Sequence, residues 1–178
     1  MPISISGSGS ITPSGSSIIS YPGAVLQVQA ARSGPASQTI SSTTPTLITG
    51  LSISFTPKKV GSVLLFNAQV SSSFTHVTSF GIFKDGVSTV STSGYTNTNE
   101  ANMQVTSYYE KPTNDARTDF INQTAFMHYE TVDSLTTRTY GVYATAGWAG
   151  TTYNLYINNR SGGDMASFSY FTIMEIAQ

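Results

Sequence analysis

The stretch that decides the fold is "SFSYFTIMEIAQ", residues 167–178. Side chains of a β-strand point alternately to opposite faces, so this segment would present apolar groups on both. Phe171 and Ile173 would lie on one face, and the other would carry Phe168, Tyr170, Met174 and Ile176. A strand with one face in water should alternate cleanly between apolar and polar residues. We therefore expect a strand covered on both faces, with Glu175 set among apolar groups.

Similar short strands, separated by turn signals, recur from Gly23 onward, a pattern typical of an all-β sandwich or barrel. Asp85 and Gly86 tolerate the positive φ of a tight primed turn, so residues 80–90 predict a hairpin. No stretch combines a helix cap, a 3.6-residue apolar period and strong helix formers. The sequence predicts a single antiparallel β-sandwich of the jelly-roll type over residues 23–178. The other expected strands cover residues 25–31, 46–57, 62–71, 103–109, 120–132, 138–147 and 152–158.

The composition is polar with little charge. Ser and Thr together number 52 of 178 residues, charged residues make up 10%, and the formal net charge is −1. This charge balance argues against nucleic-acid binding, which needs a basic surface. The absence of cysteine excludes disulfides and thiolate metal sites. No apolar run reaches the length of a transmembrane helix, so we expect no membrane insertion, and nothing in the sequence calls for a cofactor.

Residues 1–22 contain no charged side chain and are rich in Ser, Gly and Pro. One interpretation is a flexible leader. However, the segment contains more isoleucine than a Gly/Ser linker requires, and an extended segment can add to the exposed sheet edge of a partner. We favour an extended N-terminal docking arm whose contacts would be made by Ile3, Ile5, Ile11, Ile18, Ile19 and Tyr21.

Catalytic signals are weak. His76 and His128 are the only histidines, so a Ser-His-Asp triad would have to use one of them. Paired carboxylates could cleave a polysaccharide, and oxygen-rich loops can hold a divalent cation. The candidates are more simply read as a solvated connection, and we expect neither an enzyme nor a metal site. These carboxylates are Glu110, Asp115, Asp119, Glu130 and Asp133.

Several aromatic residues lie at or near predicted strand ends. An aromatic ring with a polar rim can hold a sugar or a protein partner. Packing within the fold is the simpler interpretation for half of them or more. The candidate receptor-facing residues are Tyr95, Tyr108, Tyr109 and Trp148.

The order of short motifs resembles a group of phage virion proteins and fibre-tip domains. The motifs are "VLQVQAA" (25–31), "TGLSISFTPKKVGSVLLFNAQV" (49–70), "FGIFKDG" (80–86), "TYGVYA" (139–144), "YINNR" (156–160) and "FTIMEIAQ" (171–178). The leader "MPISISGSGSIT" is also similar to the starts of phage structural proteins. The resemblance spans residues 24–178, and none of its motifs is catalytic.

The resemblance implies a jelly-roll domain that assembles as a homotrimer, comparable in outline to tumour-necrosis-factor and complement-head trimers. A sandwich preceded only by a short arm suits a capsid cement protein on the outer surface of a virion, with the major capsid protein as its partner. In such a trimer, sister subunits would cover the second apolar face of the last strand, residues 167–178. Its expected interface residues are Phe171, Ile173, Glu175, Tyr129 and Met127.

Two other functions remain open. The first is the distal receptor-binding domain of a tail fibre or tailspike that recognises a host surface glycan. The second is a polysaccharide depolymerase that would use the carboxylates between Glu110 and Asp133.

Overall fold

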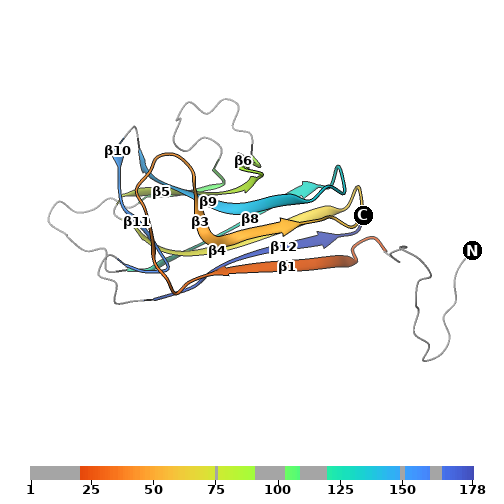
Figure 1. The fold of residues 1–178 in the computed structure, drawn as a ribbon, viewed down its shortest axis with the longest axis horizontal. Helices are drawn as coiled ribbons and strands as arrows, with labels where there is room; N and C mark the ends of the chain where they lie inside the picture. The colour runs from red at the N-terminus through yellow and green to blue at the C-terminus, as the bar shows by residue number, and fades with distance from the viewer. Residues whose placement is uncertain (1–20, 75, 91–102, 109–119, 149–150, 161–165) are drawn as a thin grey trace, which may run out of the picture.

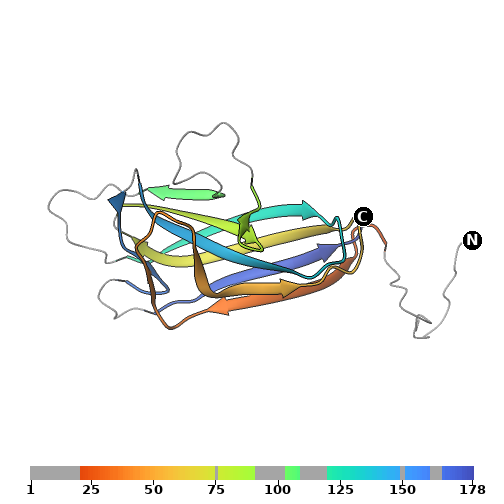
Figure 2. The same ribbon diagram turned by 45° about the horizontal axis from the view of Figure 1, so that its top comes forward.

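The computed structural model describes residues 21–74, 76–90, 103–108, 120–148, 151–160 and 166–178. These parts of the chain contain no helix and form two antiparallel sheets (Figures 1 and 2). Sheet I consists of β1 (Val25–Ser33), β2 (Gln38–Ile40), β4 (Val63–Phe74), β8 (Asn122–Thr131), β11 (Leu155–Ile157) and β12 (Ser169–Ile176). Sheet II consists of β3 (Thr46–Phe55), β5 (Val77–Lys84), β6 (Val87–Ser88), β7 (Val105–Tyr108), β9 (Arg138–Trp148) and β10 (Thr151–Thr152).

The strands of sheet I run in the order β1-β12-β4-β8, with β11 and β2 continuing beside the far end of β4. In sheet II, β9 lies between β3 and β5, and β5 also pairs with β7 and β6. The predicted all-β antiparallel sandwich is confirmed. The predicted strand positions agree with the longer strands, whereas the three-residue β2 was not foreseen.

The core lies between the two sheets and is built from period-two alternation on each side. Along β4, Leu64, Phe66, Ala68 and Val70 are all fully buried, while the residues between them point outward. The ring of Phe66 packs against those of Tyr140 and Phe171, at centroid distances of 4.9 and 6.4 Å. Burial of such side chains stabilises a fold by about 1.5–3 kcal/mol each.

The predicted hairpin is present. Asp85 and Gly86 have φ values of 52° and 81°, and Lys84 pairs with Val87 across the two-residue turn. The Asp85 carboxylate accepts hydrogen bonds from Thr139 N at 2.9 Å and Arg138 Nη1 at 3.1 Å. The backbone bond lowers the pKa of Asp85, so its charge remains on this turn in mildly acidic solution.

The face of β12 that we expected at the trimer interface is the face that packs into the core. Phe171, Ile173 and Glu175 are fully buried in the sandwich of their own chain. The prediction that they contact sister subunits is therefore wrong. The outward residues of the same strand include Tyr170, which is 46% exposed, and Met174, which is half-buried. Both faces contain large apolar groups, so alternation alone could not tell which of them faced the core.

The two ends of the described chain lie side by side at one end of the sandwich (Figure 1). Gly23 N donates to Ala177 O, and Ala177 N donates to Ala24 O, both at 2.8 Å. Tyr21 is 69% exposed. The other residues assigned to the docking arm, from Ile3 to Ile19, lie outside the described residues, so the arm remains a prediction.

Candidate functional site

The outward face of sheet I carries a set of exposed apolar side chains. Tyr129 is 70% exposed, Met127 is 68% exposed and Val28 is 52% exposed, and all three point away from the core. The strand register aligns Val28 with Met174 on the neighbouring strand. The same row continues through Leu65 and Tyr129. We call this row and the adjoining Met127, Val63 and Ile176 the apolar face.

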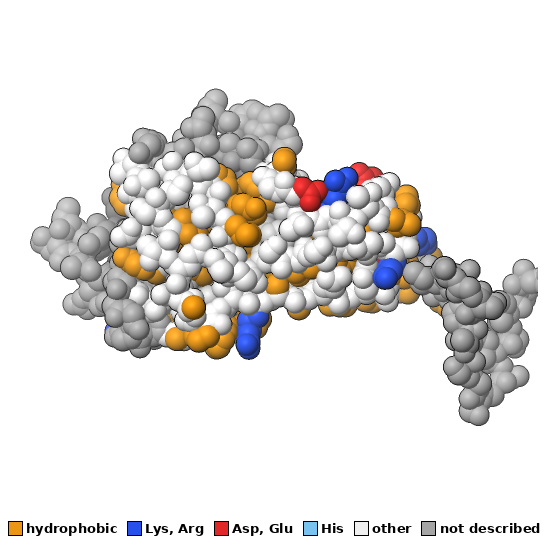
Figure 3. Space-filling model, in the orientation of Figure 1, with side chains coloured by type: hydrophobic (Ala, Val, Ile, Leu, Met, Phe, Trp, Pro, Cys, Tyr) orange, Lys and Arg blue, Asp and Glu red, His pale blue; other side chains and the backbone are white. Residues whose placement is uncertain are grey.

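The apolar face is broad and nearly uncharged. Four strands at spacings of about 4.8 Å give the row a width of roughly 14 Å. Among the outward positions of β1, β12, β4 and β8, Arg32 at the far end of β1 is the one charged residue. The face of the molecule drawn in Figure 3 also shows few Lys, Arg, Asp or Glu side chains on its described part. An exposed apolar patch of this kind is typical of a protein interaction site.

Two of the five expected interface residues lie on this face. Met127 and Tyr129 occupy alternate positions of β8 and point outward. Their role in a trimer stays a prediction. The sequence analysis missed Val28 and Leu65, although the alternation in "VLQVQAA" and "SVLLFNAQVS" contained the signal.

Glu175 is fully buried at a point where β12 meets the connection between β3 and β4. Its carboxylate accepts hydrogen bonds from Lys58 N at 2.9 Å and Lys59 N at 3.0 Å. Ser62 Oγ and Gln27 Nε2 each donate at 2.7 Å. Burial raises the pKa of Glu175, but the hydrogen bonds from Ser62, Gln27 and the two backbone amides outweigh it, so the pKa is lowered overall. All of these donors belong to the same chain, so Glu175 is held inside the sandwich and not at the expected trimer interface.

A second polar cluster lies between β8 and sheet II. Tyr140 Oη donates a hydrogen bond to Glu130 Oε1, and Lys84 Nζ lies 3.2 Å from the same oxygen. Desolvation and the adjacent Glu130 carboxylate raise the pKa of Tyr140 well above its usual range. Glu130 is thus held by the fold rather than presented as a free catalytic carboxylate.

Replacing Tyr140 by phenylalanine is expected to lower the free energy of unfolding by about 1–2 kcal/mol, because the charged Glu130 would lose a hydrogen-bond donor. Chemical denaturation at neutral pH measures this. Tyr143→Phe on the same strand is the matched control, since no hydrogen bond of its hydroxyl occurs among the described residues. Equal stability of the two variants would contradict the role given to Tyr140.

The structure describes only some of the remaining catalytic candidates. Asp133 is exposed, and Glu110, Asp115 and Asp119 lie outside the described residues. His76 stacks on Tyr153, and His128 stacks on Phe66, with centroid distances of 4.4 and 5.8 Å. Burial lowers the pKa of His128. Within the described parts of the chain, no group of three or more His, Asp or Glu residues could hold a metal ion.

The expected receptor-facing residues stay untested. Tyr95 and Tyr109 lie outside the described residues. Tyr108 and Trp148 close β7 and β9, but the described structure does not include their side chains.

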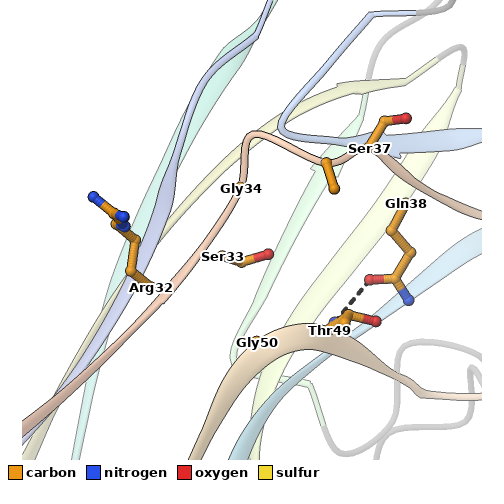
Figure 4. A pocket seen from close by; sticks show the side chains of 8 residues that line it. Arg32, Ser33, Gly34, Ser37, Gln38, Thr49 and Gly50 are labelled. Carbon is orange, nitrogen blue, oxygen red and sulfur yellow. Dashed lines mark hydrogen bonds between the residues drawn. The ribbon is translucent and has the colours of Figure 1, made fainter.

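A surface pocket of about 330 Å³ lies where β1 ends and β2 begins (Figure 4). Its lining includes Ser33, Gly34, Ser37, Gln38, Thr49 and Gly50. Sequence analysis did not single out this site, because Ser, Gly, Gln and Thr in these positions are ordinary turn and strand residues.

No protein-family model matches the sequence, and no curated protein matches it. No helix in the described ranges is long and apolar enough to cross a membrane.

Proposed function

We propose that the protein is a structural component of a virion, a homotrimeric cement protein that reinforces the outer surface of a capsid. The observation that carries this proposal is the apolar face, a surface four strands wide with one charged residue at its margin. A second copy of the chain fits this surface better than an extended segment does, because one strand covers only about 5 Å of its width.

The strand order supports the jelly-roll interpretation. Sheet I has β1-β12-β4-β8, and the long strands of sheet II run β3-β9-β5-β7. Neighbours in each sheet are thus mostly distant in sequence, as in a barrel-like sandwich built from Greek keys. The resemblance to phage virion proteins and fibre-tip domains supports the trimer, and it fits a capsid or a tail location equally.

The position of the chain ends suggests which end of the proposed trimer would face the capsid. Gly23 and Ala24 pair with Ala177, so the described chain begins at the end of the sandwich where β12 ends. In the proposed assembly this end faces the major capsid protein, and the docking arm extends over the shell. The opposite end, where β1 passes into β2, then points outward.

The test is the mass of the full-length chain in solution and its copy number in purified particles of the virus that encodes it. In solution, light scattering should give the mass of three chains. In purified virus particles, quantitative mass spectrometry should give a number of copies of this chain comparable to that of a capsid component. A handful of copies at the tail would favour the fibre-tip alternative. Absence from the particles would overturn a virion role altogether.

A further inference from the structure

The pocket between β1, β2 and β3 is a concave site that the proposed structural role does not use. It lies where β1 ends, whereas the start of β1 lies at the other end of the strand, near the C-terminus (Figure 1). Its volume of about 330 Å³ is at the lower end of the range of small-molecule pockets, about 300–1,000 Å³. The pocket is therefore large enough for one ring of a ligand rather than for an extended segment.

One wall of the pocket is fixed by Gln38. Its Nε2 donates to Leu47 O at 3.0 Å, and its Oε1 accepts from Thr49 N at 2.8 Å (Figure 4). These two bonds span the part of β3 where the pairing register with β9 shifts between Leu47 and Ser52. Gly50, with φ of 85°, follows Thr49 at this irregularity. Gln38 thus holds the bend of β3 in one geometry.

The floor of the pocket is fixed by a buried polar network. Asn158 is fully buried; its Nδ2 donates to Ser33 Oγ at 3.1 Å, and its Oδ1 accepts from Ser169 Oγ at 2.7 Å. Gly34 lies against the same network, since a Cβ there would come within 2.6 Å of Ser167 O. Floor and wall are both held by hydrogen bonds, which is the preorganisation a binding site needs.

The pocket surface is mostly C–H surface, with a few hydroxyl and amide groups set in it. Ser33 is 8% exposed and its oxygen accepts from Asn158, yet its proton has no acceptor among the described residues. Figure 4 shows the Ser33 hydroxyl pointing toward Gln38. The Thr49 hydroxyl also makes no hydrogen bond within the described chain. The site therefore offers donors and acceptors together with the C–H surface of Ala36 and the glycines.

The charge of the site restricts the ligand. Arg32 is the one charged residue of the pocket lining. Its guanidinium group lies 4.8 Å from the ring centroid of Phe168, and its side chain extends away from the pocket (Figure 4). A phosphate or carboxylate would thus find no cation inside. A neutral ligand with several hydroxyl groups and a C–H face matches the lining.

We propose that this pocket binds one neutral sugar ring of a polysaccharide. The inference goes beyond the cement role and does not rest on it, because the pocket is formed by a single chain. Ser33 and Thr49 contact the hydroxyl groups of the sugar, and Gln38 keeps the Thr49 wall in place.

The test is a titration of the full-length ¹⁵N-labelled chain with methyl glycosides of glucose, galactose, mannose, N-acetylglucosamine and N-acetylgalactosamine. At least one of them should give saturable shifts at the amides of Ser33, Gly34 and Thr49. A concentration of about 100 mM saturates a site with a Kd of about 1–10 mM. The absence of saturable shifts for every glycoside, or shifts confined to another surface, would overturn the proposal.

Thr49→Val keeps the shape and removes the hydroxyl, so it should weaken binding about tenfold, the effect of one hydrogen bond. Thr39→Val is the matched control, because Thr39 is exposed on β2 and does not line the pocket. Its affinity should be unchanged. Unaltered binding by Thr49→Val, or tighter binding of methyl glucuronide than of any neutral glycoside, would contradict a neutral-sugar site.

Discussion

Tyr129→Glu is expected to convert the proposed trimer into monomers while leaving the sandwich folded. Tyr129 is 70% exposed and lies in the row with Val28, Leu65 and Met174. Association through this face would bury an unpaired carboxylate among apolar groups, and such burial costs several kcal/mol. Three copies of the substitution act in each trimer. Light scattering at micromolar concentration should give the mass of one chain.

Val87→Glu provides the matched control for this experiment. Val87 is 69% exposed, nearly the same as Tyr129, but it belongs to the β5–β6 hairpin of sheet II. This variant should remain trimeric. Circular dichroism and a thermal melt establish that both variants are folded. A Tyr129→Glu chain that stays trimeric would place the interface elsewhere. A wild-type chain that is monomeric would contradict the trimer and leave residues 1–20 as the candidate cover of the face.

Glu175→Ala is expected to lower the free energy of unfolding by about 3–5 kcal/mol. The carboxylate is the acceptor for two backbone amides, Lys58 N and Lys59 N, and its removal leaves these part-buried donors without their acceptor. Ser62 and Gln27 lose a charged partner at the same time. Glu175→Gln keeps the volume but turns an amide donor toward other donors, so it should recover only part of the loss. Denaturant titration at pH 7 measures both variants.

The lowered pKa of Glu175 also predicts that the stability of the fold depends on pH. The folded-state pKa of Glu175 is lowered below the ordinary value of 4.5. Its contribution is therefore complete above about pH 4.5 and is lost as the pH falls through the folded-state pKa. The difference in unfolding free energy between wild type and Glu175→Gln should shrink on acidification below pH 4.5. A Glu175→Gln difference that stays constant as the pH falls below 4.5 would rule out this linkage.

The sequence predicts the longer strands well because several of them alternate with period two and most are bounded by turn residues. It predicts the Asp85–Gly86 hairpin for a local reason, since positive φ at these positions is a property of the residues themselves. Short strands such as β2 were missed because three residues carry no readable period. Their pairing depends on neighbours distant in sequence.

The orientation of β12 shows where a local pattern stops being informative. Alternation placed Phe171 and Ile173 on one face and Tyr170 and Met174 on the other, but both pairs are apolar. The choice depends on which face meets sheet II, and that is a tertiary property. Glu175 was misassigned for a related reason. Its partners include the backbone amides of Lys58 and Lys59. Nearly every residue has such an amide, so the sequence does not show which ones donate to this carboxylate.

The position of β12 in sheet I also limits when the strands of this sheet can pair during synthesis of the chain. β12 follows every other described strand in sequence, yet it lies between β1, the first, and β4. During synthesis β1 and β4 therefore wait with unpaired edges until residues 169–176 have left the ribosome, and contacts this distant in sequence form slowly. Open edges in a chain with so few charges are prone to pair with other chains. We expect nascent or prematurely terminated chains to depend on chaperones far more than the finished protein does.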